Sequence, residues 1–241
     1  SIFELFSIGI GPSSSHTVGP MRAAHRFLEQ LRSSPHLPEI EGIRCECYGS
    51  LAATGHGHGT DTAIMLGLLG EEPQTVVPRD IPGMIARLHQ QETLSVTEDK
   101  TVRFSPSRDL DLSHYQPLKL HPNGMLFTAV GKDGAPVEDA VFYSTGGGFV
   151  ASEQELLHPA EPDREPFPLP YESAEELLRM ADERHCPLSS IVMANECALL
   201  PESDVRERLD LIWTTMKQSI ASGMSAVSYT HLRAHETRGN L

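Results

Sequence analysis

The spacing of apolar residues changes several times along this chain, and each change predicts a different element. From Gly19 to Leu31 apolar side chains recur every three or four residues, with Pro20 in the first turn, which predicts a helix. Residues 43–48 alternate apolar and polar side chains, which is the pattern of a half-buried strand. A glycine-rich stretch follows this strand at residues 49–59.

Two more helices and a set of short strands complete the first half. Capping residues open a helix over residues 60–70, and a further helix is predicted over residues 81–90. Turn-forming residues divide residues 93–143 into short strands. The predicted fold class is therefore α+β, with residues 1–150 forming a domain of helices packed on a mostly antiparallel sheet.

The second half differs in composition. Prolines among acidic residues indicate an extended linker over residues 151–172. A capping box then opens a helix at Ser173, and the apolar residues 188–200 are expected to form a buried helix. Residues 201–222 carry an apolar stripe that is most simply core, and this helix is expected to end at Gly223. We expect an incomplete all-α segment here, because two or three such helices rarely form a finished domain.

Domain organisation follows from these patterns. Residues 173–224 are expected to be the start of a second, truncated domain. Residues 225–241 are polar and have no clear period, and we interpret them as an artefactual tail outside the fold.

Composition narrows the classes of function. The formal net charge of −14 argues against nucleic acid or an anionic membrane as a partner. No apolar run is long enough for a membrane span, and no leader opens the chain. The spacing of the four cysteines fits neither a zinc ribbon nor a ferredoxin. We interpret them as buried small hydrophobic residues of a protein in a reducing cytoplasm. They are Cys45, Cys47, Cys186 and Cys197.

The most concentrated candidate chemistry lies just before the first predicted helix and consists of Ser13, Ser14, Ser15, His16 and Thr17. Free amides and the helix dipole attract anions at this end of a helix. Hydroxyls, backbone amides and a cationic His16 could hold a small carboxylate or phosphate there. An ordinary helix cap is the alternative, although a cap needs only one hydroxyl.

A second candidate cluster precedes the next predicted helix. His56 and His58 alternate with glycines that let a backbone approach a ligand closely, and Asp61 is near enough to orient or charge one imidazole. One alternative for residues 55–61 is a flexible loop that ends in a Thr or Asp helix cap. A His-x-His metal site is another, but the spacing does not supply a third and fourth ligand. Residues 121–124, His-Pro-Asn-Gly, are most simply a hairpin turn.

Taken together, several motifs resemble the bacterial iron–sulfur L-serine dehydratases. The most specific is Gly-Pro-Ser-Ser-Ser-His-Thr-Val-Gly-Pro, residues 11–20. The segments that carry the resemblance are residues 3–20, 48–51, 58–61, 120–125, 143–149, 193–196 and 213–216. The last two are similar to the start of that family's catalytic α domain, so the resemblance covers roughly residues 1–224.

The resemblance implies a fold and a reaction. The first half looks like the family's β domain, which is related in fold to a domain of some phosphoglycerate dehydrogenases. Later cysteines of the family's α domain bind a [4Fe–4S] cluster, one iron of which acts as a Lewis acid on the serine hydroxyl. A base removes the α-proton, water leaves, and the resulting aminoacrylate hydrolyses to pyruvate and ammonia without pyridoxal phosphate.

The resemblance also implies roles for particular residues. Those expected to bind the substrate are Ser13, Ser14, Ser15, His16, Thr17 and Asn123. His58 and His121 are candidates for proton transfer or orientation, and Asp61 for orienting His58 or capping its helix. Asn195 and Glu196 are weaker candidates for groups that face the cleft.

Cofactor and partners follow in the same way. The resemblance implies L-serine as substrate, a homodimer when the enzyme is full length, and a role in cytoplasmic serine catabolism. Cys186 and Cys197 do not occupy cluster-ligand positions in the match, so no metal ligand is predicted in this chain. We therefore expect this polypeptide alone to bind no cluster and not to turn over serine.

Two other functions remain open from the sequence. One is a non-catalytic module that binds a small amino acid or carboxylate, which would suit the anion site. The other is a subunit completed by a separate α chain. The proline-rich linker, followed by helices that resemble the α domain, favours a broken single chain over both.

Overall fold

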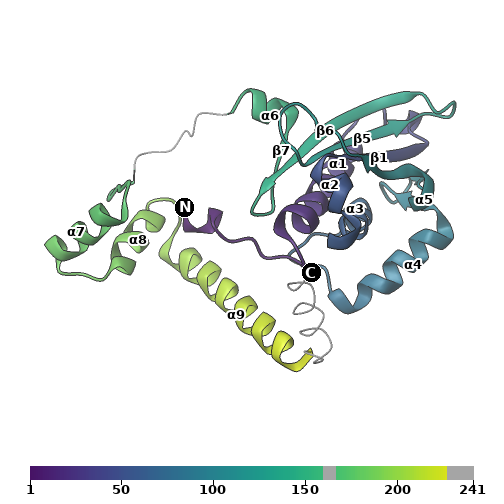
Figure 1. The fold of residues 1–241 in the computed structure, drawn as a ribbon. Coiled ribbons are helices and arrows are strands. Elements are labelled where there is room, and N and C mark those ends of the chain that lie inside the picture. The colour runs from purple at the N-terminus through teal and green to yellow at the C-terminus, as the bar shows by residue number, and fades with distance from the viewer. Residues whose placement is uncertain (160–166, 227–241) are drawn as a thin grey trace, which may run out of the picture. The chain divides into compact units, whose positions relative to one another are not determined.

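The computed structural model describes residues 1–159 and 167–226, with side chains described as far as Met224 (Figure 1). Contacts divide the chain into two compact units. The larger unit consists of residues 7–162, and the smaller combines residues 1–6 with residues 163–241. The first six residues therefore group with the helical second half, whereas the sequence analysis predicted that they belong to the domain of residues 1–150.

An open, mostly antiparallel sheet is the centre of the larger unit, which confirms the predicted α+β class (Figure 1). Its strands in the described part of the chain are β1 (Gly42–Tyr48), β2 (Thr93–Ser95), β3 (Thr101–Arg103), β4 (Leu110–His114), β5 (Gly124–Val130), β6 (Pro136–Gly146) and β7 (Phe149–Ser152). The strand order is β2-β3-β1-β5-β6-β7. One edge of β1 pairs antiparallel with β5, and its other edge pairs in parallel first with β3 and then with β4.

Helices of the larger unit pack on this sheet and on one another. They are α1 (Gly19–Arg32), α2 (Ser50–Thr54), α3 (Thr60–Leu68), α4 (Ile81–Gln91), α5 (Pro106–Asp109) and α6 (Glu153–Leu157). Helix α1 packs against α3 and against strands β5, β6 and β7. The helices predicted over residues 19–31, 60–70 and 81–90 are thus confirmed within one or two residues.

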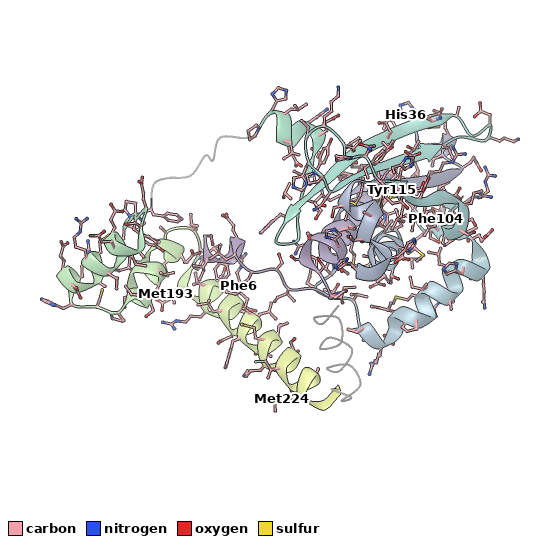
Figure 2. The ribbon with its side chains drawn as sticks, viewed as in Figure 1. Phe6, His36, Phe104, Tyr115, Met193 and Met224 are labelled. Carbon is pink, nitrogen blue, oxygen red and sulfur yellow. The ribbon has the colours of Figure 1, made fainter. Side chains whose placement is uncertain are left out.

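The core lies between α1 and the sheet, as the apolar spacing of both predicts. The ring of Phe27 on α1 stacks on Phe127 of β5 at 5.3 Å between centroids, and Phe127 meets Phe142 of β6 edge-on at 6.0 Å. Burying each such ring stabilises the fold by about 1.5–3 kcal/mol. Figure 2 shows Phe104 within this unit, where it is fully buried, and Tyr115 at its surface.

Three loop predictions for this unit are wrong. Residues 55–61 are not a flexible loop, because they contain the short 3-10 helix His56–His58 and the first turn of α3, and the unpredicted helix α2 precedes them. Residues 121–124 are not a hairpin turn, because the strands on either side of them, β4 and β5, pair with opposite edges of β1. Residues 151–157, assigned to the linker, complete β7 and form α6, which opens with a capping box between Ser152 and Glu155.

The smaller unit is helical. Its elements are the 3-10 helix Ile2–Glu4, α7 (Ala174–Arg184), α8 (Leu188–Cys197) and α9 (Glu202–Ala226). Ser173 caps α7 by accepting from the Glu176 amide at 3.2 Å, as predicted. No helix in the described ranges combines the length and the apolarity needed to cross a membrane.

Two predictions about burial in the smaller unit are wrong. Helix α8 is not buried all round, because Leu188 is 40% exposed and only one face of the helix is covered. The apolar stripe of α9 is not core: Val205 is buried, but Trp213 is 55% and Ile220 57% exposed. Helix α9 also continues through Gly223 to Ala226 instead of ending at that glycine. The residues described in this unit are too few to cover both faces of these helices.

Candidate active site

The serine-rich segment is itself the start of a helix. Ser14–Val18 makes a π-helical turn, here called the serine-rich turn, that runs directly into α1. Ser13 caps this turn because its Oγ accepts from the His16 amide at 3.2 Å and its carbonyl accepts from the Thr17 amide at 3.0 Å. The sequence predicted that these residues lie ahead of a helix beginning at Gly19; α1 does begin there, but a π-helical turn that was not predicted precedes it.

Two backbone amides at the open end of the serine-rich turn are available to a ligand. The first amides of a helix have no partner within it. Ser13 satisfies those of His16 and Thr17, and no acceptor for the amides of Ser14 and Ser15 occurs among the described residues. Ser14 is exposed and Ser15 is half-buried, so a solute can reach them. Such a pair of amides at the positive end of a helix favours a small anion.

A hydroxyl group lies at each nitrogen of the His16 ring. Nδ1 is 2.8 Å from Ser15 Oγ, and Nε2 is 3.0 Å from Ser50 Oγ. Burial lowers the pKa of His16 from its ordinary value and nearby His58 lowers it further, while the hydrogen bond with Ser50 opposes the shift. His16 is therefore neutral at pH 7, which corrects the expectation of a cationic imidazole.

Two threonines join the serine-rich turn to the start of α3. Thr17 Oγ1 donates to the His58 carbonyl at 2.8 Å, and Thr60 Oγ1 donates to the His16 carbonyl at 2.6 Å. These reciprocal bonds bring the ring centroids of His16 and His58 to 5.0 Å from each other. Sequence reasoning missed this function of Thr60 and treated it as a helix cap, whereas the N-cap of α3 is Gly59.

A single hydrogen bond determines which tautomer His58 has when its ring is uncharged. Its Nδ1 lies 2.9 Å from the Thr54 carbonyl, which can only accept, so we assign the proton to Nδ1. The remaining nitrogen, Nε2, then carries a lone pair. His58 is half-buried beside His16, and its Nε2 has the chemistry of a general base.

Asp61 pairs with His56 and not with His58. Its Oδ2 lies 3.0 Å from His56 Nδ1, and its Oδ1 accepts from the Thr62 amide at 2.7 Å. The prediction that Asp61 orients His58 or caps the helix is therefore wrong. The His56 side chain is 75% exposed, so this pair contributes at most about 1 kcal/mol to stability. A catalytic role for Asp61 stays a prediction.

Ser144 connects residues 121–124 to the serine-rich turn. Asn123 Nδ2 donates to the Ser144 carbonyl at 3.2 Å, and the Ser144 amide donates to the Asn123 carbonyl at 3.0 Å. Ser144 Oγ then donates to the Ser15 carbonyl at 2.7 Å. Asn123 is only 9% exposed, and its hydrogen bonds with Ser144 hold residues 121–124 beside the serine-rich turn. Its contact with a substrate stays a prediction.

His121 has the opposite tautomer to His58. The Asn123 amide donates to His121 Nδ1 at 3.1 Å, so in the neutral ring we assign the proton to Nε2. The neighbouring Pro122 carbonyl accepts from the Ser50 amide at 3.0 Å. Since Ser50 also bonds His16, one residue ties the His121 loop to the serine-rich turn. The two imidazoles thus provide one accepting and one donating Nε2.

Gly49 makes the approach of the His121 loop possible. It has a φ of +60°, which residues with side chains rarely adopt, and an added Cβ would lie 2.3 Å from the Pro122 carbonyl oxygen.

Sequence reasoning named neither Ser50 nor Ser144 as a site residue. Both nevertheless fall within motifs that resemble the family, residues 48–51 and 143–149, and that was the signal available for finding them.

The residues present do not fit an iron–sulfur cluster. Cys45 and Cys47 are fully buried in the core on β1, whereas Cys186 and Cys197 belong to the smaller unit. Among the described residues, no group of three or more His, Cys, Asp or Glu side chains is placed to hold a metal ion. No step of chemistry is therefore assigned to a cluster held by this chain.

Comparison with known proteins places this site in a family. The family described as serine dehydratase beta chain matches residues 1–155. The L-serine dehydratase of Streptomyces coelicolor is 40% identical over 226 residues, which are 93% of this chain and 50% of that protein. That of Mycobacterium bovis is 42% identical over 213 residues, 87% of this chain and 45% of its own length.

L-serine dehydratase 1 of Escherichia coli is 38% identical over 225 residues, 93% of this chain and 49% of that protein. The chain thus spans about half the length of the curated relatives it matches. The matched residues 1–155 contain the serine-rich turn with His16, and also His58, His121 and Ser144. On this match the chain belongs to the serine dehydratase beta chain family.

Proposed function

We propose that this chain supplies the substrate-binding half of an enzyme that dehydrates L-serine to pyruvate and ammonia. The relatives named L-serine dehydratase support the choice of reaction. The structural observation that carries the proposal is the position of His58, 5.0 Å from His16 between ring centroids, beside the serine-rich turn. That arrangement combines an anion site with a base.

The serine carboxylate binds at the open end of the serine-rich turn. The amides of Ser14 and Ser15 donate to its oxygens, and the Ser13 and Ser15 hydroxyls, 3.5 Å apart, lie beside them. The interaction depends on oriented amides and the helix dipole, because His16 is neutral. A site of this kind recognises carboxylate through hydrogen-bond geometry more than through net charge.

His58 Nε2 accepts the α-proton in this proposal. The bond from Nδ1 to the Thr54 carbonyl leaves the lone pair on Nε2, and the contact with Thr17 fixes the residue at the start of α3. A positioned base of this type contributes about 10²–10⁴-fold to a rate. His121, with its proton on Nε2, is the candidate donor that orients the substrate. Loss of the serine hydroxyl is not assigned to a residue of this chain.

The remaining features of the resemblance stay proposals. The [4Fe–4S] cluster would take its ligands from residues other than the four cysteines described above. A cytoplasmic location agrees with the four free thiols. The homodimer of the full-length enzyme stays a prediction.

Replacing Ser14 with proline tests the carboxylate site most sharply. S14P removes one free amide and keeps the helix, because proline is tolerated at the first helical position and Ser13 before it is extended, with φ −136° and ψ 136°. S14A is the matched control, since it removes the hydroxyl and keeps the amide. Calorimetric titration with L-serine should give affinity at least about tenfold weaker for S14P than for S14A.

Equal affinities of S14P and S14A, or no saturable binding by the unmodified chain, would contradict this carboxylate site. The absence of a cluster site is tested separately by anaerobic reconstitution with iron and sulfide, followed by a pyruvate assay. We expect no pyruvate from this chain alone. Pyruvate that depends on reconstitution would overturn the conclusion that its cysteines do not fit a cluster.

A further inference from the structure

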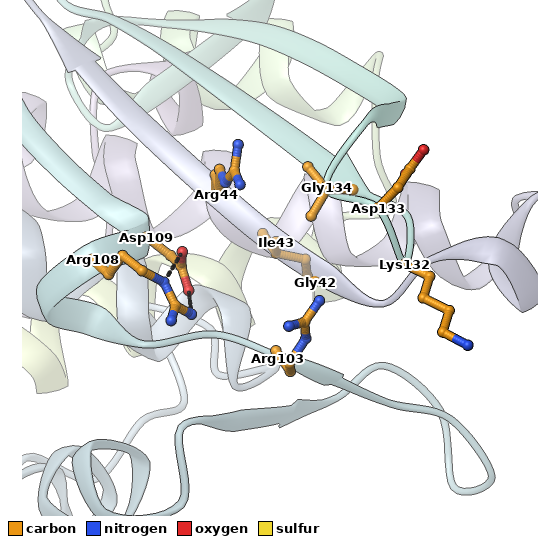
Figure 3. A pocket seen from close by; sticks show the side chains of 10 residues that line it. Gly42, Ile43, Arg44, Arg103, Arg108, Asp109, Lys132, Asp133 and Gly134 are labelled. Carbon is orange, nitrogen blue, oxygen red and sulfur yellow. Dashed lines mark hydrogen bonds and ion pairs between the residues drawn. The ribbon is translucent and has the colours of Figure 1, made fainter.

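The outer edge of β1 has a gap between its two parallel neighbours. Strand β3 pairs with β1 at Gly42, and β4 pairs with it only from Cys45 onward. Between β3 and β4 the chain leaves the sheet to form α5, Pro106–Asp109. A cavity of about 300 Å³ lies across the start of β1, with residues beside this gap on one side of it and the turn after β5 on the other (Figure 3). We call it the basic notch, and its charged lining residues are Arg44, Arg103, Arg108, Lys132, Asp109 and Asp133.

Positive charge exceeds negative charge in the basic notch, although the chain as a whole carries a net charge of −14. Four cationic side chains face two carboxylates there. Figure 3 shows Arg103 and Arg108 beside β1, Arg44 on β1 itself, and Lys132 extending from the turn between β5 and β6. Cations that gather against a strongly negative background raise the local concentration of small anions.

One carboxylate of the notch is already used. Asp109 accepts from Arg108 Nε at 2.9 Å and from its terminal nitrogen at 2.8 Å, and it also accepts from the Ser105 amide at 2.8 Å. Burial opposes the ionisation of Asp109, but its hydrogen bonds with Arg108 and Ser105, together with the charges of Arg108 and Arg44, lower its pKa from the ordinary value. The pair with Arg108 is therefore charged at pH 7. The Asp109 side chain is 7% exposed, whereas that of Arg108 is 66% exposed. A buried carboxylate therefore orients a guanidinium group that solvent can reach.

The other cations make no hydrogen-bonded ion pair of this kind among the described residues. Within the described ranges, Arg44, Arg103 and Lys132 form no ion pair with a carboxylate, and all three side chains are exposed. Arg103 makes only a long contact, 3.5 Å from its Nε to the Glu41 carbonyl. Two guanidinium groups and an ammonium group therefore remain free to donate to a ligand.

We propose that the basic notch binds a small phosphate monoester. Planar guanidinium groups match the oxygens of a phosphate group in pairs, and several cations around one cavity favour its dianion over a monoanion. The volume of about 300 Å³ suits a small ligand, at the lower end of ordinary binding sites. The notch shares no residue with the candidate active site, so this proposal stands independently of the proposed function.

Calorimetric titration of the whole chain tests the proposal. Inorganic phosphate and glycerol 3-phosphate are the probes, and acetate at equal ionic strength is the monoanion control. We expect saturable binding of one phosphate group, tighter binding of the ester than of free phosphate, and no saturable binding of acetate at the notch. Unsaturable binding of both phosphate probes would overturn the proposal, and tighter binding of free phosphate would overturn the assignment to a monoester.

Charge-matched double variants locate the site. R44Q/R103Q removes two free guanidinium groups of the notch, whereas R79Q/R87Q removes two exposed arginines outside it. R44Q/R103Q should weaken phosphate binding at least about tenfold, and R79Q/R87Q should change it little. R44K/R103K keeps the charge but loses the paired donors, so intermediate binding is expected. Equal losses in both glutamine variants, or full binding by R44Q/R103Q, would place the anion elsewhere and overturn the proposal.

Discussion

The imidazole rings of His16 and His58 lie 5.0 Å apart between centroids. The hydroxyl of Thr17 donates to the His58 carbonyl, and the hydroxyl of Thr60 donates to the His16 carbonyl. Burial lowers the pKa of His16 from its ordinary value, and the nearby His58 lowers it further. This relationship places the neutral imidazole of His16 beside two free amides, and burial together with the nearby His58 determines how His16 responds to pH.

The free energy of unfolding should fall as pH is lowered below the ordinary pKa of histidine. Burial, followed by His58, lowers the pKa of His16 in the folded state from 6.5, so the unfolded chain binds a proton first. The stabilisation from neutral His16 is complete above pH 6.5 and is lost as the pH falls from there toward its folded-state pKa. Denaturant unfolding between about pH 8 and about pH 5.5 measures this slope.

His16→Gln should show a shallower loss of stability over that pH range, because it removes the titrating group. His36→Gln is the control, since His36 is an exposed histidine with Glu39 as its partner. A slope unchanged by His16→Gln, with the folded state intact by circular dichroism, would contradict the assigned direction of the pKa shift.

Gly19 is required where α1 passes Ser144. A Cβ at position 19 would lie 2.1 Å from Ser144 Oγ, the hydroxyl that bonds the Ser15 carbonyl. Gly19→Ala should therefore lower the free energy of unfolding by about 1–3 kcal/mol. The matched helical control is Gly83→Ala on α4, where an added Cβ meets nothing within 4 Å, and it should raise stability by about 0.5–1 kcal/mol.

A second substitution separates steric clash from loss of helix geometry at this position. Ser144→Gly removes the atoms that the added Cβ would meet, so the double variant should recover part of the stability lost in Gly19→Ala. Chemical denaturation of the two single variants and the double variant measures the coupling between the two positions. Additive losses in the double variant would show that the two residues do not clash as described.

The four cysteines should divide into two classes of reactivity. Cys45 and Cys47 are fully buried on β1, and burial raises the pKa of the Cys45 thiol well above its ordinary value. Cys186 and Cys197 are half-buried. Brief alkylation of the native chain, followed by peptide mass spectrometry, should therefore label the second pair and spare the first. Fast labelling of Cys45 or Cys47 would mean that the sheet is open.

The single tryptophan of the chain reports on the apolar stripe of α9. Trp213 is 55% exposed in the structure, next to Lys217, whose ammonium group lies 5.5 Å from its ring centroid. Its fluorescence should have the long-wavelength emission of a hydrated indole and should be readily quenched by acrylamide. Blue-shifted emission that resists quenching at all protein concentrations would contradict the exposure of this helix.

Most of the larger unit could be predicted from local pattern. The helix from Gly19 and the strand that contains Ile43 and Cys45 each bury one face, so periodicity alone identified them. The same reasoning failed for α9, because an amphipathic stripe predicts a contact without showing that its partner is among the described residues. Helix α2 was missed because glycines surround it on both sides.

The candidate site was predictable in its residue types but not in its connections. The serine-rich segment, His58 and His121 stood out as motifs, whereas their bonds to Ser50, Thr60 and Ser144 join positions far apart in the chain. The pairing of Asp61 with His56 instead of His58 shows the same limit. Local spacing allowed both partners, and only the turn between the two histidines selects one.

The central claim is that L-serine binds through the amides at the open end of the serine-rich turn. The most direct measurement is titration of the nitrogen-15-labelled chain with L-serine, with each backbone amide followed by nuclear magnetic resonance. The amides of Ser14 and Ser15 should shift most and saturate together, with smaller changes at Thr17 and His58. Saturable shifts that leave Ser14 and Ser15 unchanged and gather elsewhere, such as at the basic notch, would contradict the account.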